Sequence, residues 1–128
     1  MLKLNKKEIE NVINLPGGKR YKYFIGRVAD IGKMWGLYDN GWALAGGDAM
    51  PLIALWPAPE YARLCAVSEW QHYKPMEVGV HDFLDKHLED LKKDKIGLAI
   101  FYTPADNGVV PTYEKFENDL RYELSRIE

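Results

Sequence analysis

The sequence is poor in the residues from which disulfides and metal sites are built. It contains one cysteine, Cys65, and three histidines in 128 residues. A single cysteine excludes an internal disulfide framework and is typical of proteins in a reducing cytoplasm. No HExxH or CxxC spacing occurs, and no motif that binds a metal or a cofactor is present. We therefore expect a cytoplasmic protein with no metal and no cofactor.

Long hydrophobic runs and a strong net charge are also missing. No run approaches the roughly 20 apolar residues of a membrane helix, and residues 1–7 lack the apolar core of a secretion signal. The net charge is −2, although residues 1–33 carry eight Lys or Arg against three Asp or Glu. These absences argue against a membrane partner and against nucleic acid as a partner.

The chain has the length and composition of one domain. Single domains usually run to about 100–150 residues, so we expect one domain over residues 1–128. Hydrophobic residues make up 47% of the chain, which is enough to build a buried core.

A β-hairpin is predicted at the centre of the most informative stretch. Asn40-Gly41 lies between apolar segments, and both residue types tolerate the positive φ of a type I′ turn. Because side chains alternate along a strand, a two-residue loop would create one apolar face. That face would consist of Trp35, Leu37, Trp42 and Leu44.

The apolar spacing elsewhere predicts helices and short strands in irregular order. Helices are expected from Asn5, over 19–30, 58–67 and 80–93, and from Thr112, whereas 51–56, 76–80 and 96–102 read as strands. Residues 21–25 also fit a strand. Without regular βαβ alternation, the pattern predicts an α+β fold: a mainly antiparallel sheet of about five strands with helices packed on it.

Two residues with potential chemistry fall on predicted buried faces. His87 shares the apolar stripe of the 80–93 helix, which predicts a core histidine. Cys65 points inward from the 58–67 helix together with Tyr61 and Leu64, which predicts a small buried hydrophobe. The carboxylates of the 80–93 helix, including Asp90, occupy its polar face, where solvation is the simplest interpretation.

Aromatic residues are the strongest remaining signal. The chain has four Trp and eight Tyr. Packing in the core explains many such residues, but Trp and Tyr are also enriched at binding surfaces. The candidate binding residues are Tyr38, Trp42, Trp56, Trp70, His72 and Tyr73.

Two further kinds of site are left open. Gly17-Gly18 precedes Lys19 and Arg20 at a predicted helix start, where an anion can bind; with Lys22 and Arg27 these residues form the weaker nucleic-acid alternative. An enzyme or ligand-binding site would instead need polar residues to converge in the fold. Its candidates are His72, Cys65, Tyr73, His87 and Asp48.

The same aromatic segments carry a family resemblance. The stretch from Trp35 to Leu44, the Leu55-Trp56-Pro57 step, the Tyr73-Lys74-Pro75 step and the 97–104 segment resemble the bacterial domain-of-unknown-function family 2750 over roughly residues 20–125. The resemblance implies a small, standalone, cytoplasmic bacterial protein. It implies no activity and no catalytic residues.

The sequence as a whole favours a non-enzymatic protein-binding module of the adaptor or immunity type. A surplus of aromatic residues without a catalytic motif supports this hypothesis. The alternative is a small-molecule-binding domain or an enzyme whose site is assembled only in the fold. A homodimer through the predicted edge strand 76–80 is also left open, although Lys74 and Pro75 oppose strand pairing.

Overall fold

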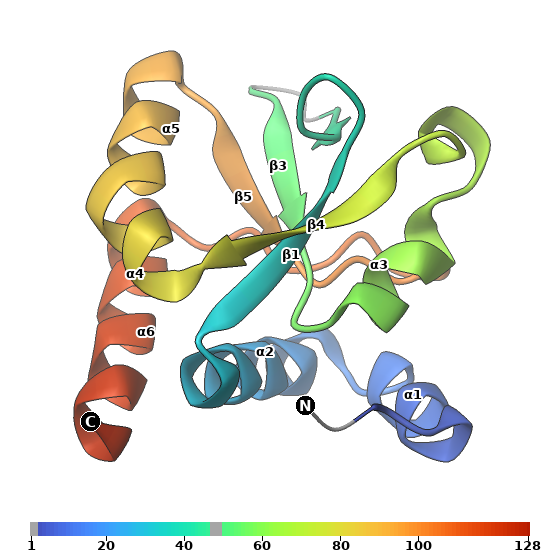
Figure 1. The fold of residues 1–128 in the computed structure, drawn as a ribbon, viewed down its shortest axis with the longest axis horizontal. Helices are drawn as coiled ribbons and strands as arrows, with labels where there is room; N and C mark the ends of the chain where they lie inside the picture. The colour runs from blue at the N-terminus through green and yellow to red at the C-terminus, as the bar shows by residue number, and fades with distance from the viewer. Residues whose placement is uncertain (1–2, 47–49) are drawn as a thin grey trace.

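The computed structural model describes residues 3–46 and 50–128 and has the predicted α+β class. Figure 1 shows the strands in the middle, α2 beneath them, α4, α5 and α6 on one side and α1 and α3 on the other. The helices are α1 (Lys6–Ile13), α2 (Gly17–Ile31), α3 (Pro59–Cys65), α4 (Val80–Asp82), α5 (Leu88–Asp94) and α6 (Tyr113–Ile127). In the described ranges, no helix is long and apolar enough to cross a bilayer.

The strands form two small sheets. They are β1 (Lys33–Tyr38), β2 (Leu44–Ala45), β3 (Leu52–Leu55), β4 (Lys74–Gly79) and β5 (Gly97–Ile100). β1 pairs with β4 and β2 pairs with β3, both antiparallel, whereas β3 pairs with β5 in parallel. A pair of backbone hydrogen bonds between Trp35 and Trp56 joins β1 to the end of β3. The helical crossover between β3 and β5 is what a parallel pair requires.

Local signals explain most helix boundaries. The Asn5 side chain caps α1 by accepting a hydrogen bond from the Glu8 N–H at 2.8 Å. Thr112 caps α6 in the same way through the Lys115 N–H. α2 is a helix rather than a strand, and it ends at Gly32, whose φ of 83° suits glycine.

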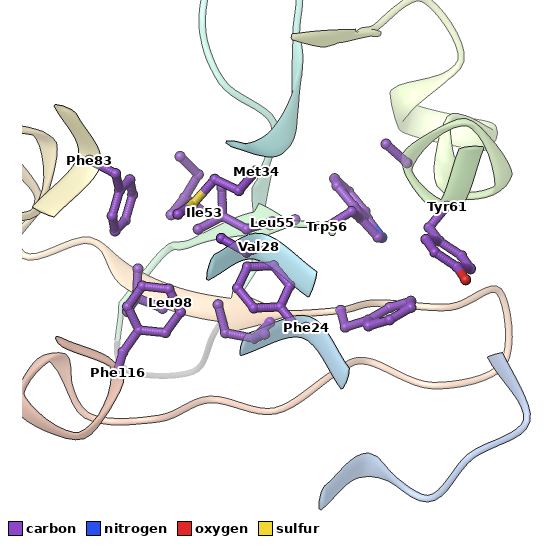
Figure 2. Packing of buried hydrophobic residues seen from close by; sticks show 14 of the residues in the cluster. Phe24, Val28, Met34, Ile53, Leu55, Trp56, Tyr61, Phe83, Leu98 and Phe116 are labelled. Atoms are coloured by element: carbon purple, nitrogen blue, oxygen red, sulfur yellow. The ribbon is translucent and has the colours of Figure 1, made fainter. Parts of the chain in front are cut away.

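One core connects the sheets to the helices. Figure 2 shows Phe24 and Val28 from α2 packed against Leu55, with Phe116 from α6 and Phe83 next to Leu98 and Ile53. Each of these side chains is buried. Burial of this apolar surface is the main force that holds the sheets and the helices together.

The hairpin differs from its prediction in turn type and register. Asn40 has a φ of 57°, but Gly41 does not have a positive φ, so a type I′ turn does not form. Tyr38 pairs with Trp42 across a three-residue loop, and β1 takes β4 as its main partner. Since a shift by one residue moves side chains to the opposite face, Leu44 is exposed while Leu37 is buried.

Two predicted inward-facing side chains are exposed. Leu64 points to solvent from α3, although Tyr61 and Cys65 are buried as expected. His87 is exposed, so the prediction of a core histidine was wrong. The reason is a π-helical turn over Phe83–His87, which connects α4 to α5. A π turn holds more residues than an α turn, so the apolar stripe continues without His87.

The chain bends sharply after β5 at Phe101, which has a φ of 68°. Gly108 lies against this bend with a φ of 83°, and a Cβ on Gly108 would approach the Ile100 carbonyl oxygen to 2.7 Å. Only glycine satisfies both the backbone angle and the close approach.

We expect Gly108→Ala to lower the free energy of unfolding by about 2–3 kcal/mol, because it adds αL strain and a clash with rigid backbone. Gly26→Ala is the matched control. Gly26 lies within α2, and a methyl group at its Cβ position would have no atom within 4 Å, so this change should stabilise by about 0.5–1 kcal/mol. Urea denaturation measures both values, and equal effects would contradict the role of the bend.

Candidate functional site

A mostly apolar cavity of about 230 Å³ lies between α5, the π turn and the strands. We call it the α5 pocket. Its walls come from β3, β4, the residue before β5 and the segment that follows β1. The lining residues are Trp42, Ile53, Leu55, Val78, Phe83, His87, Asp90, Leu91, Asp94 and Ile96.

The floor of the α5 pocket belongs to the hydrophobic core. Ile53, Leu55 and Phe83 are each 5% exposed or less. Figure 2 shows Ile53 and Leu55 on the strand at the centre of the core and Phe83 on the side of the helices. A ligand that entered the pocket would therefore contact apolar side chains that are held rigidly by their neighbours.

Trp42 forms a partly exposed wall of the pocket. Its ring contacts Tyr38 edge to face, with the ring centroids 5.1 Å apart. The ring also lies directly over Gly36 in β1, where a Cβ would come within 2.8 Å of Cε3 and Cζ3. Gly36 and Tyr38 thus position the indole, and the pocket depends on the absence of a side chain at residue 36.

Gly36→Ala is expected to displace the Trp42 ring and to destabilise the protein by about 1–3 kcal/mol through overpacking. The indole N–H resonance of Trp42 should shift in a ¹H–¹⁵N spectrum. Gly41→Ala is the control, because Gly41 has no atom near its Cβ position and no positive φ. An unchanged Trp42 resonance in Gly36→Ala would contradict the contact.

The opposite wall is polar and acidic. His87, Asp90 and Asp94 project from the end of the π turn and from α5, and all three side chains are exposed. Among the described residues, neither carboxylate has an ion-pair or hydrogen-bond partner. The nearby Lys92 instead pairs with Glu89 and Glu117. Within the same part of the chain, no three His, Cys, Asp or Glu side chains are placed to hold a metal ion.

Most of the predicted aromatic binding residues lie elsewhere. Trp56 and Trp70 are buried and pack edge to face at 6.2 Å between ring centroids. The Trp56 Nε1–H donates to the Tyr102 carbonyl oxygen at 2.9 Å, which satisfies its only polar atom. His72 is exposed and Tyr73 packs at the edge of the core. Only Trp42 lines the α5 pocket, with Tyr38 behind it.

The predicted anion site has a different arrangement. Arg20 is 2% exposed, and its guanidinium donates to the carbonyl oxygens of Leu15 at 2.8 Å and Phe101 at 3.3 Å. Its Nη2 lies 2.9 Å from Oδ2 of Asp106. Lys19 is exposed beside it. Because the guanidinium of Arg20 is already bonded to these three groups of the protein, it is not available to an external anion.

The residues of the enzymatic alternative do not converge where they are described. Cys65 is buried, its Sγ lies 3.5 Å from the Tyr102 carbonyl oxygen, and burial raises its pKa to about 11. A thiol with a raised pKa is a poor nucleophile. Neither His72, Tyr73 nor His87 forms a hydrogen bond with Cys65 or with another of these residues. Asp48, the fifth candidate, lies outside the described residues.

Sequence reasoning missed the acidic wall of the pocket. Asp90 and Asp94 follow the spacing of a solvated helix face, and nothing in that spacing indicates a cavity. The i, i+3 and i+7 positions of His87, Asp90 and Asp94 place them along one side of a helix. That side could be recognised as a pocket wall only once the strands beside α5 were known.

The comparison with known families gives a clear result. Residues 21–120 match the family described as "Protein of unknown function (DUF2750)". No curated protein matches the chain. The match spans most of the 128 residues and includes Gly36, Trp42, the strands and α5, so both walls of the pocket lie within it. The chain therefore belongs to the DUF2750 family.

Proposed function

We propose that this protein is a small-molecule-binding domain whose ligand occupies the α5 pocket. The observation that carries the proposal is the combination of a buried apolar floor with polar groups confined to one wall. Ligand sites in proteins are typically concave and apolar with a few polar groups that orient the ligand. A cavity of about 150 Å³ is large enough for benzene, so about 230 Å³ accommodates a somewhat larger molecule.

The π turn supports the same assignment. Phe83 and His87 begin and end this turn, and both line the pocket. π-helical turns interrupt the regular hydrogen bonding of a helix and occur frequently at functional sites. Here the turn exposes His87 at the pocket while Phe83 stays in the core.

Burial of the tryptophans weighs against the protein-binding hypothesis derived from the sequence. That hypothesis needed exposed aromatic rings, but Trp35, Trp56 and Trp70 are at most 9% exposed. Trp42 is the exception, and it belongs to the pocket. The small-molecule hypothesis accounts for this residue, because Trp42 would contact a ligand bound in the α5 pocket.

The proposal is tested by a thermal-shift screen of metabolites against the wild-type protein and two variants. A ligand that binds only the folded state raises Tm. Leu91→Trp fills the pocket and should abolish the rise, whereas Leu64→Trp, on the exposed side of α3, should retain it. Hits that stabilise Leu91→Trp as strongly as wild type, or a screen without any hit, would contradict the proposal.

A second candidate function is self-association through α6. Tyr122 and Ile127 on α6 are 63% and 54% exposed. Tyr122 lines a groove between α2 and α6, and Ile127 lines a separate hollow beside it. Exposed apolar patches are typical of interaction surfaces, and these two side chains would contribute to such a patch on the C-terminal half of α6. Light scattering over a range of concentrations tests this candidate with Tyr122→Glu as the variant. A wild-type monomer at every concentration would exclude it.

A further inference from the structure

We infer that the ligand of the α5 pocket is an organic cation, an amine or ammonium group carried on a compact apolar body. The inference rests on the proposed function, since it names the chemical class that this pocket selects. Three features of the pocket lead to it: its charge, its aromatic wall and its depth.

The α5 pocket carries two acidic side chains for which the described residues provide no ion-pair partner. The ten described residues that line the pocket include Asp90 and Asp94 but no Lys or Arg. Neither carboxylate has an ion-pair partner in the described part of the chain, where the other acidic residues of α5 and α6 often do. A carboxylate without a protein partner is available to a positively charged ligand, and it repels an anion.

The groove between α2 and α6 provides an internal comparison. It also contains carboxylates, but Asp119 there accepts hydrogen bonds from Tyr21 and from Lys115, at 2.7 Å and 3.0 Å. Its other carboxylate, Glu123, pairs with Arg126 at 3.1 Å, so both carboxylates of that groove have partners within the protein. Of the two hollows, only the α5 pocket combines an apolar interior with carboxylates that lack partners among the described residues.

The aromatic wall favours a cation for a second reason. The Trp42 indole is partly exposed and lines the same pocket as the carboxylates. The electron-rich face of an indole attracts ammonium groups more strongly than other side-chain rings do. Because Gly36 has no side chain, the ring can pack directly on β1, so this wall is already formed before a ligand binds.

The contrast between the buried floor and the exposed rim of the pocket indicates the shape of the ligand. Leu55 and Phe83 at its floor are buried and apolar, whereas Asp90 and Asp94 are exposed. Transfer of an apolar body from water to the floor of the pocket would lower its free energy. The charged end of the ligand would stay hydrated near the carboxylates. The two ends of the pocket therefore fit the two ends of an amphiphilic cation.

The inference is tested by calorimetry with four probes that share one apolar body. They are 2-phenylethylamine, its trimethylammonium analogue, 2-phenylethanol and 3-phenylpropionate. We expect the two cations to bind about tenfold more tightly than the alcohol, and the carboxylate to bind more weakly than the alcohol. Asp90→Asn/Asp94→Asn should remove most of the difference between cation and alcohol while it leaves the affinity for the alcohol unchanged.

The control variant is Asp82→Asn/Glu114→Gln, which changes the net charge equally at exposed carboxylates outside the pocket. It should retain the preference for cations. Equal affinities of amine and alcohol in the wild type, or an equal effect of both double variants, would overturn the cation inference while the pocket remains a binding site. If no probe binds, and Leu91→Trp also leaves every screening hit unaffected, the proposed function fails together with the inference.

Discussion

Trp56→Ala is expected to lower the free energy of unfolding by about 3–5 kcal/mol, the largest effect we predict for a single substitution. The ring is fully buried at the end of β3, it packs against Trp70, and its backbone joins β3 to Trp35. Alanine would leave a large cavity among side chains that several elements hold in place. It would also remove the donor to the Tyr102 carbonyl oxygen.

Trp56→Phe separates these contributions. Phenylalanine keeps most of the apolar volume but has no N–H group, so the Tyr102 carbonyl oxygen loses its donor. We expect a loss of about 1–3 kcal/mol, clearly below that of alanine. Urea denaturation with tryptophan emission as the probe measures both variants. A loss under about 1 kcal/mol for Trp56→Ala would show that the ring is not part of the core.

Arg20→Met is the second large effect, with an expected loss of about 2–4 kcal/mol. Methionine retains the apolar stem but leaves the carbonyl oxygens of Leu15 and Phe101 without their buried donor. The Phe101 carbonyl belongs to the bend with positive φ after β5, so its partner stabilises a strained backbone. Lys19→Met is the control, because Lys19 is exposed and its loss should change stability by less than about 0.5 kcal/mol.

The ion pair between Arg20 and Asp106 predicts that the stability of the protein depends on pH. The Arg20 guanidinium, whose Nη2 lies 2.9 Å from Oδ2 of Asp106, holds the pKa of that carboxyl below its ordinary value. A carboxylate with a lowered pKa stabilises the folded state at pH values above its unfolded pKa, and this stability is lost as the pH falls through the folded pKa. The Asp106 side chain is 49% exposed, so the effect should be small. Asp106→Asn should remove this pH-dependent contribution to stability. A comparison of Tm at neutral and acidic pH, for the wild type and the variant, measures it.

Local patterns in the sequence were sufficient for the helices. The Asn5 and Thr112 caps, the apolar spacing of α2 and α6 and the acidic start of α3 all depend on residues within one or two turns of each other. Their interactions are set by the covalent chain, so they can be predicted without knowing the rest of the fold. The π turn is the exception, because the apolar spacing from Val80 to Leu91 fits an α-helix equally well.

Strand pairing depended on more than the local pattern. Asn40-Gly41 favours a hairpin between neighbouring segments, yet β1 pairs mainly with β4, which follows it by more than thirty residues. Two backbone hydrogen bonds between Trp35 and Trp56 also tie β1 to the end of β3, about twenty residues further along the chain. Distant contacts of this kind outweigh the preference of a short turn, because they bury large aromatic surfaces.

The sequence by itself determined the α+β class, the helices and their caps, the buried strands β3 and β5, and the family. It also identified Trp42 as a residue to watch, without indicating what surrounds it. The tertiary structure decided which tryptophans are core, where His87 points and that Asp90 and Asp94 border a cavity. The physical reason is that helices follow from neighbours along the chain, whereas a pocket is the space left between segments that meet only after the chain has folded.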